Sequence, residues 1–438
     1  MLTKIKLGLL NRIATTCVTL FLSSIAFTST ASAEAWVRMW GYAPFQSTYY
    51  GGSDAISDIQ VDKDGTIYFA GVTNSYQLGG IVLGAEVYTG VVGKMDTHGN
   101  LLWSRELGVQ RFSNTVMVSM GRDQYGYTYT LGETSGSSSV PESDVVGNGI
   151  YEKQVFVVKH DANGNQQWLM PIALSKDLYM PKLSTTNLGY SIITGSRLGT
   201  DGVYRVVAYR INYWGNLVGP IEYPAVKSEL VTDVTTDGYY YYIAYKSFEN
   251  SGANGDPYDT GLKRVDRYLS LRWSTRSNQI GWEEPSAVVY NFSNNQIMVF
   301  GTNGSSAAVT GFDYRGNFLY QKTYYTAPNQ PFIGEVYVKD AVQTANGEIL
   351  ATGSIGKNGV KNNGWGNDIL YAKYSATGDP LDVKNIGAYN TRDPGNAIAV
   401  DAAGNFYIGG AAGGNVEDQL ATPNSGVSKD FIMLKNKP

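Results

Sequence analysis

The sequence predicts an all-β fold, a seven-bladed β-propeller of four-stranded blades, and three observations support this prediction. Gly accounts for 51 of the 438 residues and Tyr for 33, whereas charged residues make up only 16% of the chain. That composition favours many short strands joined by tight turns over helical bundles, coiled coils and disordered segments. A pair of β-hairpins recurs along the chain. The copy at the C-terminus is incomplete, and a single strand-like segment near the N-terminus supplies what it lacks.

Each repeat begins with a hairpin in which apolar and polar residues alternate on both sides of a turn. Residues 54–71 (DAISDIQVDKDGTIYFAG) show this pattern, and residues 396–410 (NAIAVDAAGNFYIGG) repeat it. Seven such turns are centred on Gly65, Gly126, Gly189, Gly238, Asn295, Gly347 and Gly404. They are 61, 63, 49, 57, 52 and 57 residues apart, which is a period long enough for four short strands.

A second hairpin follows each first one. Residues 91–103 (VVGKMDTHGNLLW) match residues 156–168 (FVVKHDANGNQQW). Weaker copies turn at Gly215, near Ser270, at Gly316 and at Gly378. Two hairpins in each repeat give four strands, and four strands at this period predict the blade of a propeller.

The two ends of the chain are predicted to complete the last blade together. Seven first hairpins are present, but the seventh second hairpin begins at residues 430–436 (DFIMLKN) and the sequence then ends. Residues 36–41 (WVRMWG) carry Trp, Arg and Gly at the same spacing as residues 103–108 (WSRELG). We therefore expect the N-terminal segment to pair with the C-terminal strand and close the ring, leaving no strand edge unpaired.

The two hairpin motifs together resemble the SBBP-type bacterial β-propeller repeat. The motifs are I-A-V-D-x-x-G-N-x-Y-I-x-G and V-x-K-x-D-x-x-G-N-x-x-W, and they match best over residues 51–108 and 393–436. The match is poorest over residues 174–330, where four tyrosines at 239–242 replace the usual strand. The resemblance implies a secreted or surface-attached propeller and no particular reaction.

Two tryptophans follow a turn glycine at G-x-x-x-W spacing, namely Trp103 and Trp168. This spacing also resembles quinoprotein and outer-membrane assembly propellers, in which such tryptophans lock neighbouring blades. Neither adjacent cysteines nor a cluster of metal ligands accompanies them, so we expect no bound quinone and no other cofactor. The tryptophans are predicted to pack between blades.

The first 33 residues predict a cleavable secretory signal peptide. Three basic residues precede an apolar run over residues 13–27, which is too short to span a bilayer comfortably, and Ala-Ser-Ala follows at residues 31–33. Cleavage would leave residues 34–438 as one propeller domain without a membrane span, and would remove Cys17, the only cysteine. We expect a secreted or periplasmic protein without disulfide bonds.

Few residues suit catalysis or metal binding. His98 and His160 lie at or beside turns, where an exposed or structural role is favoured over a Ser-His-Asp set or a zinc site. Residues 62–65 (DKDG) are similar to the start of a calcium loop, but Thr73 stands where an EF-hand needs Glu, so a turn is favoured. A net charge of −4 without a basic stripe argues against nucleic acid as a partner.

The loops between the second and third strands and those between blades emerge on one face of a propeller. On this face the sequence places exposed aromatic side chains beside carboxylates: Tyr49, Tyr50, Asp256, Asp259, Trp282, Glu283, Glu284 and Trp365. Such a mixture suits stacking on sugar rings, or a hot spot for a partner protein. The alternative is that these aromatic side chains pack under their own loops.

These observations predict an exported, non-enzymatic binding or scaffold module for a surface glycan or an envelope protein. One alternative is a hydrolase or lyase acting on extracellular polysaccharide, which would need two carboxylates facing each other across a sugar. Another is a periplasmic factor in envelope assembly. The fold does not choose among them, because propellers support many functions.

Overall fold

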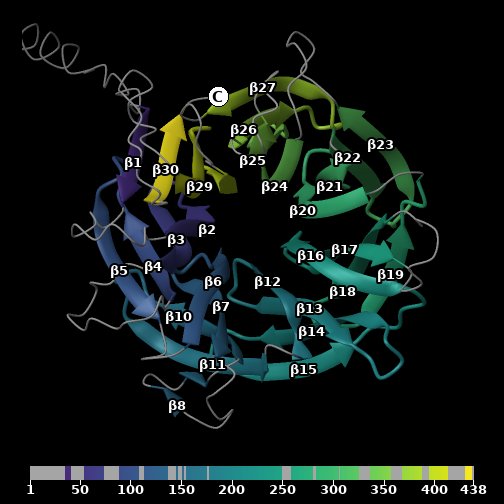
Figure 1. Cartoon of the computed structure of the whole chain (residues 1–438), viewed down its shortest axis with the longest axis horizontal. Helices are drawn as coiled ribbons and strands as arrows, with labels where there is room; N and C mark the ends of the chain where they lie inside the picture. Colours follow the sequence, from purple (N-terminus) through teal and green to yellow (C-terminus); the bar gives the residue numbers. More distant parts are fainter. Residues whose placement is uncertain are drawn as a thin grey trace, which may run out of the picture. The chain divides into compact units, whose positions relative to one another are not determined.

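Seven four-stranded antiparallel sheets form a ring, and in each sheet the strand that begins the first hairpin of its repeat lies nearest the centre (Figure 1). The computed structural model describes residues 35–40, 54–73, 88–107, 113–136, 145–146, 150–151, 154–174, 177–248, 258–279, 283–304, 306–324, 336–356, 367–386, 394–412 and 430–436. Internal contacts divide the chain into two units, Met1–Ala35 and Trp36–Pro438. All described strands belong to the second unit, and Ala35 is the only described residue of the first.

The first three sheets follow one another along the chain. Blade 1 consists of β2 (Ala55–Val61), β3 (Ile67–Thr73), β4 (Thr89–Met95) and β5 (Leu101–Leu107). Blade 2 consists of β6 (Ser113–Arg122), β7 (Thr128–Gly136), β10 (Gln154–His160) and β11 (Gln166–Leu174). A small ribbon of β8 (Val145–Val146) and β9 (Ile150–Tyr151) lies between β7 and β10 in the sequence. Blade 3 consists of β12 (Tyr179–Thr185), β13 (Ser191–Leu198), β14 (Tyr204–Ile211) and β15 (Leu217–Glu222).

The next three sheets have the same strand order. Blade 4 consists of β16 (Ser228–Thr236), β17 (Tyr240–Phe248), β18 (Asp259–Asp266) and β19 (Leu271–Arg276). Blade 5 consists of β20 (Glu283–Asn291), β21 (Gln296–Asn303), β22 (Ser306–Asp313) and β23 (Phe318–Tyr324). Blade 6 consists of β24 (Val336–Gln343), β25 (Ile349–Gly356), β26 (Asn367–Tyr374) and β27 (Pro380–Ile386). The prediction of seven four-stranded blades is therefore confirmed.

The last blade takes its outer strand from the other end of the unit. Blade 7 consists of β28 (Gly395–Val400), β29 (Phe406–Ala412), β30 (Asp430–Asn436) and β1 (Trp36–Trp40). β1 runs antiparallel to β30, with Trp36 opposite Lys435 and Trp40 opposite Phe431. How much this pairing stabilises the ring stays a prediction.

The repeated Asp-x-x-Gly-Asn sequence forms a turn that its own side chains hold. In the turn between β4 and β5, Gly99 N donates to Asp96 O at 3.1 Å, and Asp96 Oδ1 accepts from His98 N and Asn100 N at 2.8 Å each. Gly99 has a φ of +79°, a conformation that Gly adopts without steric cost. Positive φ recurs at every predicted turn centre: Gly65, Gly126, Gly189, Gly238, Asn295, Gly347 and Gly404 in first hairpins, and Gly99, Gly164, Gly215, Leu269, Gly316 and Gly378 in second ones.

The apolar core is divided among the junctions between blades. Within the described residues, buried apolar side chains form seven clusters, and each cluster joins two neighbouring blades. The cluster between blades 7 and 1 packs Tyr407 and Met433 against Ile56 and Phe69. Every sheet therefore buries both of its faces, and this is the source of hydrophobic stabilisation in the ring.

The spacing of Lys and Trp that recurs in the second-hairpin motif is explained by contacts with the next blade. Trp103 Nε1 and Lys94 Nζ both donate to the carbonyl oxygen of Ala162, at 3.1 and 3.2 Å. Trp168 Nε1 donates in the same way to Tyr213 O at 3.2 Å. The expectation that these tryptophans pack between blades is confirmed.

Candidate functional site

The predicted ligand-binding residues fall mainly outside the part of the chain that the structure describes. Tyr49, Tyr50, Asp256, Trp282 and Trp365 lie outside the described residues. Asp259 is half-buried at the start of β18. The predicted face therefore stays a prediction for its aromatic members.

The two glutamates of this predicted group differ in exposure. Glu283 is buried, and its Oε2 accepts hydrogen bonds from Thr260 N and Ser277 Oγ at 2.6 Å each. Gln321 Nε2 donates to the other carboxylate oxygen of Glu283. Glu284 is exposed and forms an ion pair with Lys246 at 3.1 Å. Glu283 thus joins strands of neighbouring blades, and only Glu284 presents its carboxylate to solvent.

The two histidines have different surroundings. His98 is exposed, whereas His160 is buried, with its ring centroid 6.4 Å from that of Trp103. Burial, and then the charge of Arg105, lowers the pKa of His160 to about 4, which keeps the imidazole neutral near pH 7. Among the described residues, no group of three or more His, Cys, Asp or Glu side chains is placed to hold a metal ion.

Three aspartates and one lysine stand at corresponding positions on innermost strands. Asp58 on β2, Asp233 on β16 and Asp340 on β24 each follow a shift in the register between the first and second strands of their blade. Lys182 follows the same kind of shift on β12. All four side chains are half-buried. The register shifts thus bring four ionisable groups to the inner ends of blades 1, 3, 4 and 6.

Each of the three carboxylates bonds to the innermost strand of the following blade. The donors to Asp58, Asp233 and Asp340 are the main-chain N atoms of Met120 (2.6 Å), Val288 (2.8 Å) and Ile398 (2.7 Å). In all three cases the acceptor is a side chain of one blade and the donor is a main-chain amide of the next blade, so the hydrogen bond links the two blades. These aspartates therefore have a structural role in three blade junctions.

The same aspartates influence one another across the centre of the ring. Burial raises the pKa of Asp58 to about 7 against the opposing effects of the Met120 amide and Lys182. Burial, and then the charges of Asp58 and Asp233, raises the pKa of Asp340 to about 8. The pKa of Asp233 is also raised, chiefly by burial. The carboxylates of blades 1, 4 and 6 therefore favour the protonated state more than free aspartate does.

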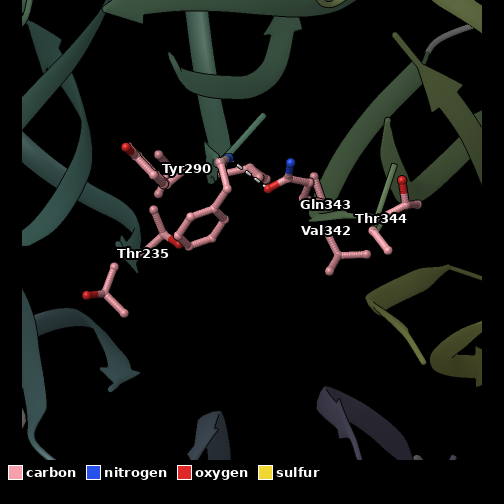
Figure 2. A pocket seen from close by; sticks show the side chains of 11 residues that line it. Thr235, Tyr290, Val342, Gln343 and Thr344 are labelled. Carbon is pink, nitrogen blue, oxygen red and sulfur yellow. Dashed lines mark hydrogen bonds between the residues drawn. The ribbon is translucent and has the colours of Figure 1, made fainter. Parts of the chain in front are cut away.

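A hollow of about 420 Å³ opens where the innermost strands of blades 4, 5 and 6 reach their hairpin turns. Figure 2 shows Tyr290 of β20 and Gln343 of β24 beside it, with Thr235 of β16 nearby. Gln343 Oε1 accepts from Phe292 N at 3.0 Å, and Gln343 Nε2 donates to Asn291 Oδ1 at 2.8 Å. These bonds fix one wall of the hollow, which mixes threonine hydroxyls with aromatic rings.

Exposed aromatic side chains gather on the hairpin turns of blades 2 to 5. Both hairpin turns of a blade lie at the same end of its strands, because the four strands are antiparallel. Among the described residues, and besides Tyr190 (36%), six rings at this end are exposed: Tyr125 (59%), Trp214 (71%), Tyr239 (78%), Tyr268 (63%), Phe292 (63%) and Tyr314 (43%). We call these six residues the aromatic turn face. Tyr125 and Trp214 belong to neighbouring blades and both contact Tyr213. The centroid of the Tyr213 ring lies 6.1 Å from that of Tyr125 and 5.5 Å from that of Trp214.

The other blades show that the turn itself does not need these rings. The two middle positions of the corresponding turns in blades 1, 6 and 7 hold Lys63 and Asp64, Thr97 and His98, Ala345 and Asn346, Ala376 and Thr377, and Ala402 and Ala403. The turn with two alanines closes by a bond from Gly404 N to Asp401 O at 3.0 Å. The turn with Tyr213 and Trp214 closes by the equivalent bond, from Gly215 N to Asn212 O at 2.9 Å. The exposed rings are therefore an addition to a turn that folds without them.

The sequence carried a signal for the aromatic turn face that the prediction did not use. At least one turn in each of blades 2 to 5 carries a large apolar or aromatic residue, and none of the predicted turns of blades 1, 6 and 7 does. The aspartates at the inner strands carried no such signal, because a shift in strand register has no distinctive sequence. Of the predicted ligand residues, the described Asp259, Glu283 and Glu284 begin β18 and β20, at the end of the strands opposite to the aromatic turn face.

Comparisons with known proteins show no family for this chain. No protein-family model matches it, and no curated protein matches its sequence. Among the described residues, no helix has the length and apolar character that crossing a membrane requires.

Several solved structures are similar at low sequence identity. The propeller of Dos1 has a TM-score of 0.42 and 11% identity, over 88% of this chain and 94% of that chain. A subtype N11 neuraminidase-like protein of A/flat-faced bat/Peru has a TM-score of 0.42 and 10% identity, over 73% and 86% of the two chains. A protein of unknown function from Bacteroides caccae has a TM-score of 0.40 and 11% identity, over 67% and 89%. Likenesses at this level supply no argument about function.

Proposed function

We propose that this chain is an exported β-propeller of the SBBP type that acts as a non-enzymatic binding or scaffold module. Its ligand would be a surface glycan or an envelope protein, and its binding surface the aromatic turn face. The observation that carries the proposal is that, among the described hairpin turns, only those of blades 2 to 5 carry exposed rings, although the same turn forms with Ala, Thr and Asn elsewhere.

The stability of the fold does not explain the exposed aromatic side chains of the aromatic turn face. An exposed aromatic side chain contributes little to the stability of its own fold, while a group of them favours association. Tyr and Trp offer a flat apolar surface with a polar edge, which suits both sugar rings and protein partners. The hollow beside Phe292 adds a concave region with hydroxyl and amide groups next to these rings. Together they provide stacking surfaces and hydrogen-bonding groups at the same end of the blades.

The binding test compares two positions on the aromatic turn face with a matched control. Trp214→Ala and Tyr268→Ala should each weaken binding of a ligand identified on a glycan array, or of a purified envelope protein, at least tenfold, about 1.4 kcal/mol. Tyr179 is also exposed but lies at the other end of its blade, so Tyr179→Ala should bind normally. Normal binding by both turn variants, with unchanged thermal midpoints, would contradict the proposal.

The same assay decides between the two candidate faces. Trp282→Ala and Trp365→Ala alter residues of the ligand face predicted from the sequence, and both variants should bind normally if the aromatic turn face is the binding surface. If these two variants lose binding while the turn variants keep it, the ligand site belongs to the loops between blades.

Export is tested separately by the mature N-terminus. Residues 31–33 (ASA) predict that protein recovered from outside the inner membrane begins at Glu34. Intact mass and N-terminal sequencing would check this, and recovery of a membrane-bound form that retains Met1 would contradict it.

A further inference from the structure

Two neighbouring turns of the aromatic turn face each carry an exposed arginine against an exposed tyrosine. In blade 4, Arg267 Cζ lies 4.9 Å from the centre of the Tyr268 ring, and Arg267 Nη2 donates to Tyr268 Oη at 2.8 Å. In blade 5, Arg315 Cζ lies 5.2 Å from the centre of the Tyr314 ring, and Arg315 Nε donates to Tyr314 Oη at 2.7 Å. We call these the two Arg–Tyr pairs.

Both pairs are held in place by the preceding blade. Arg210 Nη1 of blade 3 donates to the carbonyl oxygen of Arg267 at 3.0 Å. Arg264 Nη1 and Trp273 Nε1 of blade 4 both donate to the carbonyl oxygen of Tyr314, at 3.0 and 3.3 Å. The main chain of each turn is therefore fixed from the neighbouring sheet at the same turn position, which is Arg267 in blade 4 and Tyr314 in blade 5.

The carboxylates of the same turns point back into the turns. Asp266 is buried, and its Oδ1 accepts from Tyr268 N and Ser270 N at 2.8 and 2.9 Å. Asp313 Oδ1 accepts from Arg315 N and Asn317 N at 2.9 Å each. Within the described residues, Arg267 and Arg315 form no ion pair with a carboxylate. What these turns present to solvent is thus a ring and a cation.

From this geometry we infer that the two Arg–Tyr pairs bind an anionic polysaccharide, an inference that rests on the proposed function. A sugar ring can stack on a tyrosine while its carboxylate or sulfate accepts two hydrogen bonds from the adjacent guanidinium. Two such pairs in corresponding turns of consecutive blades suit a polymer in which charge and ring recur, although Arg precedes Tyr in blade 4 and follows it in blade 5. The chain as a whole is acidic, with a net charge of −4, so attraction for an anion has to come from a local site such as this one.

The experiment measures binding of four purified probes to the full chain: polygalacturonate, dextran sulfate, neutral dextran and single-stranded oligo-dT. The inference predicts that at least one of the two anionic polysaccharides binds at least tenfold more tightly than dextran and oligo-dT. This binding should weaken as salt is added, because the guanidinium contacts are exposed. The affinities for polygalacturonate and for dextran sulfate, compared with each other, show whether the site prefers a carboxylate or a sulfate.

Variants then assign the binding to the two pairs. The double variant Arg267→Gln with Arg315→Gln should lose at least tenfold in affinity for the preferred polysaccharide, with an unchanged thermal midpoint. Lys63 is an exposed cation in a turn of blade 1 that has no aromatic residue, so Lys63→Gln should bind normally. Normal binding by the double arginine variant, or equal binding of dextran or oligo-dT by the unmodified chain, overturns the inference.

A third variant separates this inference from the proposed function. One outcome is that the double variant Tyr268→Ala with Tyr314→Ala loses binding of dextran or of a protein ligand that the arginine variant still binds. In that case the inference of an anionic polysaccharide is wrong, and the aromatic turn face remains the binding surface. If neither double variant changes the binding of any ligand that the chain takes, both proposals are wrong.

Discussion

Three aspartates on inner strands combine a structural hydrogen bond with an unfavourable place for charge. Asp58, Asp233 and Asp340 each accept a main-chain N–H from the next blade, which a protonated carboxyl or an amide oxygen can also do. Burial penalises the ionised form and raises the pKa of all three, and the charges of the other aspartates raise the pKa values of Asp58 and Asp340 further. At these three blade junctions, a hydrogen-bond acceptor stabilises the structure, whereas a negative charge does not.

A pH-dependent stability follows. Between about pH 4 and pH 8, Asp58 and Asp340 hold protons in the folded chain that the unfolded chain has released, since their folded pKa values are about 7 and about 8 against 3.8. The free energy of unfolding should therefore fall as pH rises through this window. Urea unfolding at about pH 5 and about pH 8 would measure the difference.

The amide variants supply the control. Asp58→Asn with Asp340→Asn keeps an oxygen that accepts from Met120 N and Ile398 N, but removes the titration. The double variant should lose most of the decline in stability between these two pH values and be the more stable protein at the higher one. A decline as steep as that of the unmodified chain would show that other groups cause it.

At the scale of the element, the hairpin turn and the tryptophan beside it act as one unit. Gly164 has a φ of +78°, and a Cβ added there would come within 2.7 Å of the Trp103 ring of the preceding blade. Gly238 has a similar φ of +94°, but a Cβ there would meet nothing within 4 Å. The first glycine is needed for both its conformation and its small size, and the second for conformation alone.

Alanine at these two glycines should separate the two requirements. Gly238→Ala should lower the free energy of unfolding by about 1 kcal/mol, the cost of the left-handed conformation. Gly164→Ala should cost at least about 1 kcal/mol more, because Trp103 must also move from its contact with blade 2. Urea unfolding of both variants checks the order, and equal losses would mean that Trp103 adjusts without cost.

Turn positions could be predicted from the sequence, whereas strand register could not. Asp and Gly at fixed spacing dictate most of the turns, and the alternation of the hairpin strands predicts the two that lack Gly, at Asn295 and near Ser270, where Leu269 takes the positive φ. The register shifts that place Asp58 and its counterparts depend on how each inner strand packs against its neighbours. The exposure of the aromatic turn face likewise depends on how the blades are arranged around the propeller. Residue type and spacing alone therefore favour the loops between blades as the ligand site.

At the scale of the whole ring, stability depends on all seven junctions because each sheet is covered by its two neighbours. The junction between blades 7 and 1 joins segments from opposite ends of the unit, and its apolar cluster includes Tyr407 with Ile56. A ring opened at this junction would expose apolar surface on both sides. Pairing of β1 with β30 is the main-chain connection that accompanies this packing.

Truncation tests what β1 contributes to closure. A chain that begins at Tyr42 lacks β1 and leaves β30 as an unpaired edge, whereas a chain that begins at Trp36 keeps all five residue pairs between them. At about 1 kcal/mol for each lost main-chain hydrogen bond, the shorter chain should be a few kcal/mol less stable, and its thermal midpoint should fall by several degrees. Its exposed edge should also promote association as concentration rises, which light scattering would detect. If the two chains unfold at the same temperature and remain equally monomeric, β1 does not close the ring, and blade 7 is stable with three strands.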